Sequence, residues 1–220
     1  VRADKFKSLV TQNIGQVVQK VGYPVMSTIQ DDPTRQVRVY SRIVRLTMLI
    51  TCTLVMGLLG CAESMIHVLI GEQWLPSVPY LRLLGLSGLF LPLILASVNV
   101  FNANGKSEVT LKLEVIKTLL AVIPVTLGII YDINMMLWGM VAVSALSYLV
   151  HAWYVSKEIP YFLVLQVADI IPFFACSAVM GGVVYVIGNA IELSQLLTLL
   201  VQLAAGFVIT VISYEFIYRA

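Results

Sequence analysis

The hydrophobic and polar positions divide the chain into long apolar stretches separated by short polar breaks. Five stretches, each of about 17 to 24 residues, contain no Asp, Glu, Lys or Arg. About 20 apolar residues in a helix cross the ~30 Å hydrocarbon core of a bilayer. The pattern therefore predicts an all-α, polytopic membrane protein. The five stretches are 46–62, 83–105, 133–156, 170–191 and 193–214.

The polar breaks predict about seven transmembrane helices, because segments rich in Pro, Gly and Asn end helices. The first five helices are expected to form one bundle within 1–156, and two further helices occupy 157–220. The segment 161–168 is apolar but short, and we expect it to lie at the membrane interface. The expected helices are about 3–28, 43–70, 80–102, 110–131, 134–156, 169–190 and 194–218.

The placement of Lys and Arg predicts the orientation in the membrane. If successive helices alternate in direction, one side receives nine basic residues, whereas the other has Glu72, Asp132 and Glu192 with Arg82 as its only nearby base. Cytoplasmic loops are enriched in Lys and Arg, so the basic side is predicted to be cytoplasmic. The nine basic residues are Arg35, Arg38, Arg42, Arg45, Lys106, Lys112, Lys117, Lys157 and Arg219.

The first helix, 3–28, is unusually polar for such a chain. At ~100° per residue, Gln12, Gln16, Gln19 and Tyr23 fall within about 40° of Lys5. Arg2 and Ser8 lie about 60° to either side of it. The opposite face is apolar and carries Phe6, Val10, Ile14, Val17 and Val21.

This polar stripe has two interpretations. The helix could lie flat as an amphipathic anchor, or use the stripe to bond to neighbouring helices. Alternatively it spans the membrane, with the stripe lining a water-filled cavity. Ionisable groups at bilayer depth cost about 2.5–3.5 kcal/mol each and normally face a bundle interior, which favours the cavity.

Composition adds a few exclusions. Only 12% of residues are charged, against roughly 25% in soluble chains, and the net charge of +2 comes with no nucleic-acid signature. Cys52, Cys61 and Cys176 lack metal-ligand spacing. The sequence "NGKS" (104–107) has Val100 where a P-loop needs its first Gly. We find no catalytic cluster, and we expect no enzyme, cofactor or metal.

Several polar residues invite pairing hypotheses. We expect Arg82 to pair with Glu72, or to line the outer mouth of a cavity. Glu63 and His67 are spaced for a bonded pair or a proton relay. Glu114 and Lys117 have the spacing of a helical ion pair.

Other residues are expected to serve packing. His151 is expected to be packed or interfacial, and Asn99 and Asn102 face a cavity or bond across helices. Small residues four apart favour close helix packing, as in the pairs Ser177/Gly181 and Ala178/Gly182.

Three blocks carry a family resemblance. "ADKFKSLVTQNIGQVVQKVGYPVMSTIQDDPTR" (3–35), "IGEQWLPSVPYLRLLGLSGLF" (70–90) and "NANGKSEVTLKLEVIK" (102–117) resemble polysaccharide flippases of the multidrug/oligosaccharidyl-lipid/polysaccharide exporter superfamily. The nearest likeness is to the type that serves O-antigen, colanic-acid and teichuronic-acid synthesis. Family members have two helical lobes around a central cavity, and the likeness is to the C-terminal lobe followed by two extra helices. Because the chain begins with Val1 and no N-terminal lobe precedes it, we expect a part of a longer protein.

The resemblance implies transport of undecaprenyl-diphosphate-linked oligosaccharide across the bacterial inner membrane by alternating access. Cationic groups in a partly dehydrated cavity attract a diphosphate strongly. We therefore expect Arg2 and Lys5 to contact phosphate, and Gln12, Gln16 and Gln19 to contact sugar, with Arg82 near the outer mouth. The alternatives are a small-molecule exporter of the same superfamily, and a membrane-embedded subunit or enzyme acting on the same lipid carrier. A cation exporter would carry acidic cavity residues, and an enzyme would need a larger loop.

Overall fold

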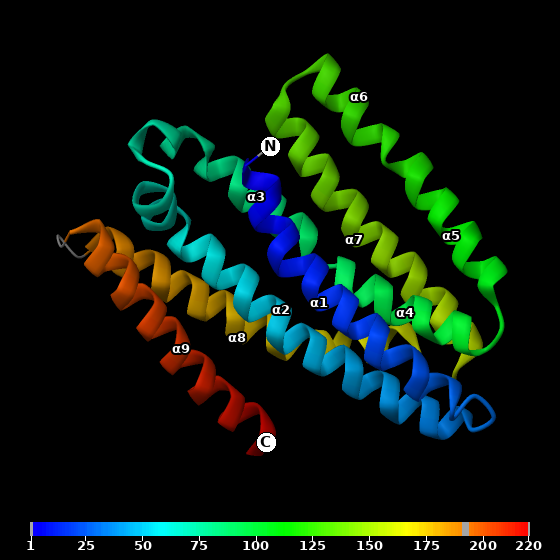
Figure 1. Cartoon of the computed structure of the whole chain (residues 1–220). Coiled ribbons are helices and arrows are strands. Elements are labelled where there is room, and N and C mark those ends of the chain that lie inside the picture. Colours follow the sequence, from blue (N-terminus) through cyan, green and yellow to red (C-terminus); the bar gives the residue numbers. More distant parts are fainter. Residues whose placement is uncertain (1, 191–193, 220) are drawn as a thin grey trace.

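The computed structural model is a bundle of long helices that run side by side (Figure 1). It describes residues 2–190 and 194–219, and side chains within 15–190, 194–213 and at Glu215. Six helical segments of the described part are long and apolar enough to cross a membrane. The chain is therefore a polytopic all-α membrane protein, as predicted. The six segments are Pro33–Leu69, Glu72–Ala103, Ser107–Ile130, Ile133–Glu158, Leu163–Ala190 and Gln195–Ser213.

The helices follow one another with short connections. A 3-10 turn, η1 (Glu72–Ser77), precedes the third helix. The α-helices are α1 (Arg2–Ser27), α2 (Pro33–Leu69), α3 (Val78–Gly88), α4 (Leu91–Ala103), α5 (Ser107–Leu120), α6 (Val122–Ile130), α7 (Ile133–Glu158), α8 (Leu163–Ala190) and α9 (Gln195–Arg219).

Two helices begin earlier than the apolar pattern predicts. The second starts at Pro33 rather than near 43, because Asp32 caps it by accepting a hydrogen bond from the Arg35 backbone N at 2.9 Å. Pro33 at the first position is compatible with such a start. The segment 161–168 is mostly helical rather than a separate interfacial stretch, since α8 begins at Leu163. Polar residues in the first turn of α2 hid its start from the hydropathy pattern, whereas α8 starts in the apolar segment 163–165.

Two predicted helices are broken near proline. The helix expected over 80–102 ends as α3 at Gly88 and restarts as α4 at Leu91, with Pro92 at its second position. The helix expected over 110–131 changes from α5 to α6 at Ala121, three residues before Pro124. Proline removes a backbone donor and clashes with the preceding turn, so each break falls just before the ring.

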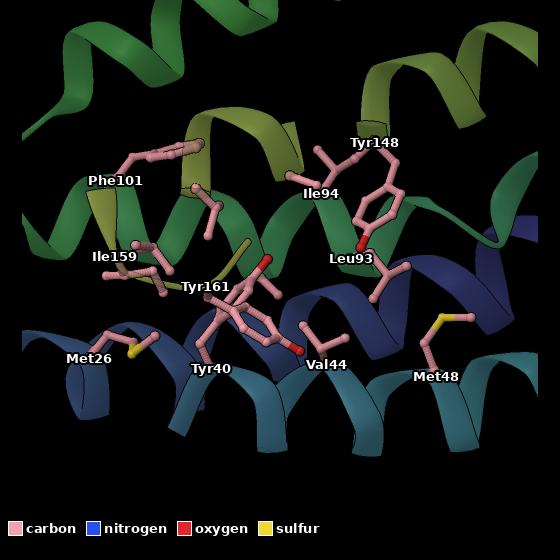
Figure 2. Packing of buried hydrophobic residues seen from close by; sticks show 14 of the residues in the cluster. Met26, Tyr40, Val44, Met48, Leu93, Ile94, Phe101, Tyr148, Ile159 and Tyr161 are labelled. Carbon is pink, nitrogen blue, oxygen red and sulfur yellow. The ribbon is translucent and has the colours of Figure 1, made fainter. Parts of the chain in front are cut away.

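The main core lies where α1, α2, α4 and α7 meet (Figure 2). Tyr40 of α2 is fully buried, and its hydroxyl is 2.9 Å from the Ser97 hydroxyl of α4. Its ring meets the Tyr161 ring edge-on at 5.8 Å. Tyr161 also donates a hydrogen bond to Asp169, and burial followed by this bond raises the pKa of Tyr161. The connection between α7 and α8 is thereby fixed to α2.

The last two helices pack on the outside of α2. A Cβ on Gly60 of α2 would lie 2.7 Å from the Gly181 carbonyl oxygen of α8, so the two backbones require glycine there. This confirms the close packing predicted for Ser177/Gly181. Gly182 has no other atom within 4 Å of its Cβ position, so the same prediction for Ala178/Gly182 is wrong. One face of α8 alone is therefore pressed against the bundle.

Candidate functional site

The polar first helix packs against the bundle rather than apart from it. α1 contacts α4, α2 and α3, and Figure 1 shows it running alongside α2 in the opposite direction. Its 26 residues extend about 39 Å at 1.5 Å each, which is enough to cross a bilayer core. Because α1 is too polar, it is not among the six helical segments that qualify as membrane spans by length and hydropathy. That α1 crosses the membrane therefore stays a prediction.

Close contact between α1 and α4 involves Gly22 and Asn99. Asn99 of α4 is buried, and its Nδ2 donates to the Val18 backbone oxygen of α1 at 2.9 Å. A Cβ on Gly22 would lie 2.4 Å from that Nδ2. Asn99 therefore forms the predicted bond across helices, and it also lines an adjacent cavity.

A cavity of about 580 Å³ opens beside this contact, at the end of the bundle where α4 turns into α5. We call it the α1–α4 cavity. Gly105 forms the turn with a φ of +70°, a conformation that favours glycine. The Asn102 Oδ1 accepts a hydrogen bond from the Thr110 hydroxyl at 3.0 Å and secures the wall. The lining residues are Gln19, Lys20, Tyr23, Asn99, Asn102, Gly105 and Ser107.

The chemistry of the α1–α4 cavity is cationic and rich in hydrogen-bonding groups. Lys20 is its one charged residue among the described lining residues, and an ammonium acts on phosphate as a point charge with three donors. Gln19 and the two asparagines contribute amide groups, and Ser107 contributes a hydroxyl. Such a set suits an anionic ligand with hydroxyl groups. In the described part of the chain, no three His, Cys, Asp or Glu residues are grouped to hold a metal ion.

A second concavity flanks α1 on its other side. This α1–α2 groove has a volume of about 420 Å³. Its walls are aliphatic apart from one glycine and one threonine. The lining residues are Val17, Val18, Val21, Gly22, Ile43, Leu46, Thr47 and Ile50.

The predicted site residues are not all brought together. Gln19 lines the α1–α4 cavity, and Gln16 is exposed on the same helix. The side chains of Arg2, Lys5 and Gln12 lie outside the described residues. Lys20 was missed as a site residue, although on the wheel it lies about 60° from Lys5, at the edge of the stripe. That position was the signal that could have found it.

Arg82 lies in a different place. It lines a small pocket with residues of α2, α8 and α9. Its predicted partner Glu72 is instead 2.8 Å from the Nε2 of His67, so the pairing with Glu72 is wrong. The same contact overturns the expected Glu63–His67 pair. Gly71 has a φ of +108°, and this turn brings Glu72 back toward the end of α2.

One pairing prediction and one packing prediction are confirmed. The Lys117 Nζ lies 2.5 Å from the Glu114 Oε1. His151 is buried, with its Nδ1 2.7 Å from the Ser147 backbone oxygen and its ring 6.4 Å from that of Phe101. It therefore serves packing.

Comparison with known proteins supports the family resemblance. Residues 1–79 match the family model described as polysaccharide biosynthesis protein. An uncharacterized membrane protein in the cps region of Klebsiella pneumoniae is 24% identical, over 84% of this chain and 44% of the relative. The teichuronic acid biosynthesis protein TuaB of Bacillus subtilis (strain 168) is 21% identical, over 88% of this chain and 41% of the relative. No solved structure matches the chain.

The resemblance predicted from three sequence blocks is thus confirmed as a similarity to the polysaccharide biosynthesis family. The chain spans about two fifths of the length of the curated relatives that it matches.

Proposed function

We propose that this membrane protein takes part in moving oligosaccharide linked to undecaprenyl diphosphate across the bacterial inner membrane for surface polysaccharide synthesis. One observation carries the proposal. The α1–α4 cavity combines a lysine with amides and a hydroxyl, on a helix whose other side borders an apolar groove. A lipid-linked oligosaccharide needs both environments, since its headgroup is polar and its carrier is a hydrocarbon chain.

Within the cavity, Lys20 is the proposed contact for diphosphate. The Lys20 side chain is exposed at the cavity, so a bound headgroup would exclude water from it and thereby strengthen the attraction between the charges. Gln19, Asn102 and Ser107 are the proposed contacts for sugar hydroxyls, because amides and hydroxyls both donate and accept hydrogen bonds.

The proposed path continues along α1. Lys5 and Lys20 are 15 positions apart in this helix, about 22 Å at 1.5 Å per residue. Arg2 and Lys5 at one end and Lys20 at the other would hold the diphosphate at two depths. Gln12 and Gln16 lie between them for the sugars. Alternating access would occur in the full-length protein, with the part that this chain lacks as the opposing lobe.

The alternatives fit less well. A cation exporter of the same superfamily would need a carboxylate in the cavity, and the described lining residues include none. An enzyme acting on the carrier would need a sizeable loop outside the membrane. The connections between described α-helices are instead short, the longest being residues 70–77, which include η1.

Binding of the substrate tests the proposal directly. The purified chain in detergent is titrated with a fluorescent oligosaccharide linked to polyprenyl diphosphate. We expect Lys20→Gln to weaken binding about tenfold, because a hydrogen bond to a charged group contributes about 1.5–3 kcal/mol. Lys20→Arg should retain most of the affinity.

Lys112→Gln is the matched control, since Lys112 is an exposed lysine that lies over the Tyr154 ring outside the cavity. Equal affinity of the Lys20→Gln and Lys112→Gln variants would refute the assignment of the cavity. Polyprenol without phosphate is the second probe. If it bound as tightly as the diphosphate, the role of the cation would be refuted.

A further inference from the structure

A second polar concavity lies at the opposite end of the bundle from the α1–α4 cavity. Figure 1 shows the end of α2, the start of α3, the end of α8 and the start of α9 meeting there. The pocket, which we call the Arg82 pocket, has a volume of about 50 Å³. A water molecule needs roughly 10–15 Å³ by this measure, so the pocket is the size of about three to five waters. It is open on one side and can receive the polar end of a small headgroup.

The Arg82 side chain is fixed in this pocket by two contacts, but not all of its hydrogen-bond donors have an acceptor among the described residues. Its Nε donates to the Leu59 backbone oxygen at 3.2 Å, and its guanidinium lies 5.0 Å from the centre of the Tyr185 ring. Its Nη2 is buried and has no hydrogen-bond partner in the described part of the chain. A buried donor on a cation without an acceptor is costly. The geometry therefore provides a fixed donor that an added acceptor would satisfy.

Gln202 supplies the complementary acceptor. Its side chain is 2% exposed, and its Nε2 donates to the Val184 backbone oxygen at 2.9 Å. A Cβ on Gly188 would lie 2.3 Å from this Nε2, so the amide is pressed against α8. Its Oε1 is buried without a partner among residues 2–190 and 194–219. The exposed carboxylate of Glu63 lines the same pocket.

These groups select for a ligand that is itself of mixed charge. Arg82 and Glu63 cancel in net charge, so a simple anion or a simple cation is attracted by one group and repelled by the other. A group with both charges satisfies both. The pocket also lies where helices end, on the side of the bundle predicted to face the outer headgroups. Large apolar side chains are exposed on α8 and α9 nearby and offer a surface for acyl chains; they include Val186, Leu196 and Leu203.

We infer that the Arg82 pocket binds the zwitterionic headgroup of an aminophospholipid such as phosphatidylethanolamine. The phosphate accepts a hydrogen bond from Arg82, and the ammonium donates to Glu63 and to the Gln202 Oε1. The ammonium has three donors, enough for both acceptors. This site does not depend on the proposed function, since it uses a different end of the molecule.

Lipid selectivity tests the inference. The purified chain in detergent receives equimolar dioleoyl phosphatidylethanolamine, phosphatidylglycerol and phosphatidylcholine, and native mass spectrometry measures the retained lipid. We expect phosphatidylethanolamine to be retained about tenfold more than either other lipid. Phosphatidylcholine lacks the ammonium N–H donors, and phosphatidylglycerol meets the Glu63 carboxylate with an uncompensated charge.

Substitutions of Arg82 and of Glu63 should change the retention of the lipids in different ways. Arg82→Gln should lower retention of phosphatidylethanolamine about tenfold, as expected for loss of a charged hydrogen bond. Glu63→Gln should lower phosphatidylethanolamine but raise phosphatidylglycerol. A misfolded protein would not produce such a gain. Glu72→Gln, at the same end of the bundle but outside the pocket, is the matched control and should change neither lipid.

Three results would overturn the inference. Equal retention of the three lipids by the unmodified chain would remove the selectivity. An unchanged lipid preference in Glu63→Gln would show that the Glu63 carboxylate does not bind the ammonium. Displacement of the lipid by an equal concentration of soluble phosphoethanolamine would assign the pocket to the free headgroup instead.

Discussion

The two concavities that flank α1 are similar in size and opposite in chemistry. The α1–α4 cavity has about 580 Å³ and the α1–α2 groove about 420 Å³. Neighbouring residues of α1 line both concavities. Gln19 and Lys20 line the α1–α4 cavity, and Val17 and Val21 line the α1–α2 groove. Volume therefore does not identify a site for a charged ligand. The difference lies in the partner helix, because α4 presents amides where α2 presents aliphatic side chains.

The difference between the two sides also has a structural cause. The α4 side is tied to α1 by the bond from Asn99 to the Val18 backbone, which Gly22 makes possible. No hydrogen bond between the described side chains of α1 and α2 corresponds to it. We expect the α4 side to be the more sensitive to substitution, and three predictions test this from the largest effect to the smallest.

Gly22→Ala should have the largest effect. The added Cβ would overlap the Asn99 Nδ2, at 2.4 Å, and break the bond to Val18. Leaving the buried Asn99 amide donor without its partner should lower the free energy of unfolding by about 1–3 kcal/mol. The measurement is the thermal unfolding midpoint in detergent. Gly182→Ala is the control, because Gly182 is a helical glycine with open space around it; equal midpoints for both variants would contradict the prediction.

Cysteine labelling should separate the two sides by about tenfold or more in rate. Cys52, Cys61 and Cys176 are first replaced, and single cysteines are placed at Gln19 or Val21. A membrane-impermeant maleimide should modify Gln19→Cys faster, because the thiolate forms in an aqueous cavity and not in an apolar groove.

Met26→Cys is the protected control on the same helix, since Met26 is fully buried. Protection of Gln19→Cys to the same degree would show that the stripe serves helix packing. Equal rapid labelling at Gln19 and Val21 would show that α1 lies outside the membrane.

Substitution of one wall hydroxyl on each side should give the smallest effect. Thr110→Val removes the donor to Asn102, and we expect a loss of about 1 kcal/mol in the free energy of unfolding. Thr47→Val, in the wall of the α1–α2 groove, should change the unfolding midpoint little. A larger loss from Thr47→Val than from Thr110→Val would reverse the comparison.

Local sequence signals predicted the fold to a large extent. Apolar runs of spanning length identified five of the six candidate spans, and the polar breaks identified the sixth, Ser107–Ile130. The 3.6-residue period identified the polar stripe of α1. Where the prediction of helix ends was wrong, the cause was also local. The cap at Asp32 and the ring of Pro92 outweigh average hydropathy. The division of the chain at 156/157 into a bundle and two extra helices stays a prediction, as do the roles of Arg2, Lys5 and Gln12.

The candidate site was predicted only in part. Gln19 lines the α1–α4 cavity, Lys20 was not recognised, and Arg82, predicted near the outer mouth, lies in a separate pocket at the other end of the bundle. That any of these residues contacts substrate stays a prediction. A helical wheel orders residues around one helix. It contains no information on how deep α4 or α8 lies against that helix.

The sequence by itself determined what depends on neighbours along the chain: an all-α membrane protein, the amphipathic first helix, and the Glu114–Lys117 pair. Only the tertiary structure decided which helices approach closely. Three contacts follow from that approach. Gly22 contacts Asn99, and the Arg82 guanidinium lies over the Tyr185 ring. His67 bonds to Glu72 and not to Glu63. The physical reason is that periodicity and capping act within a few residues, whereas these contacts require particular packing distances and a glycine turn that bring separate segments together.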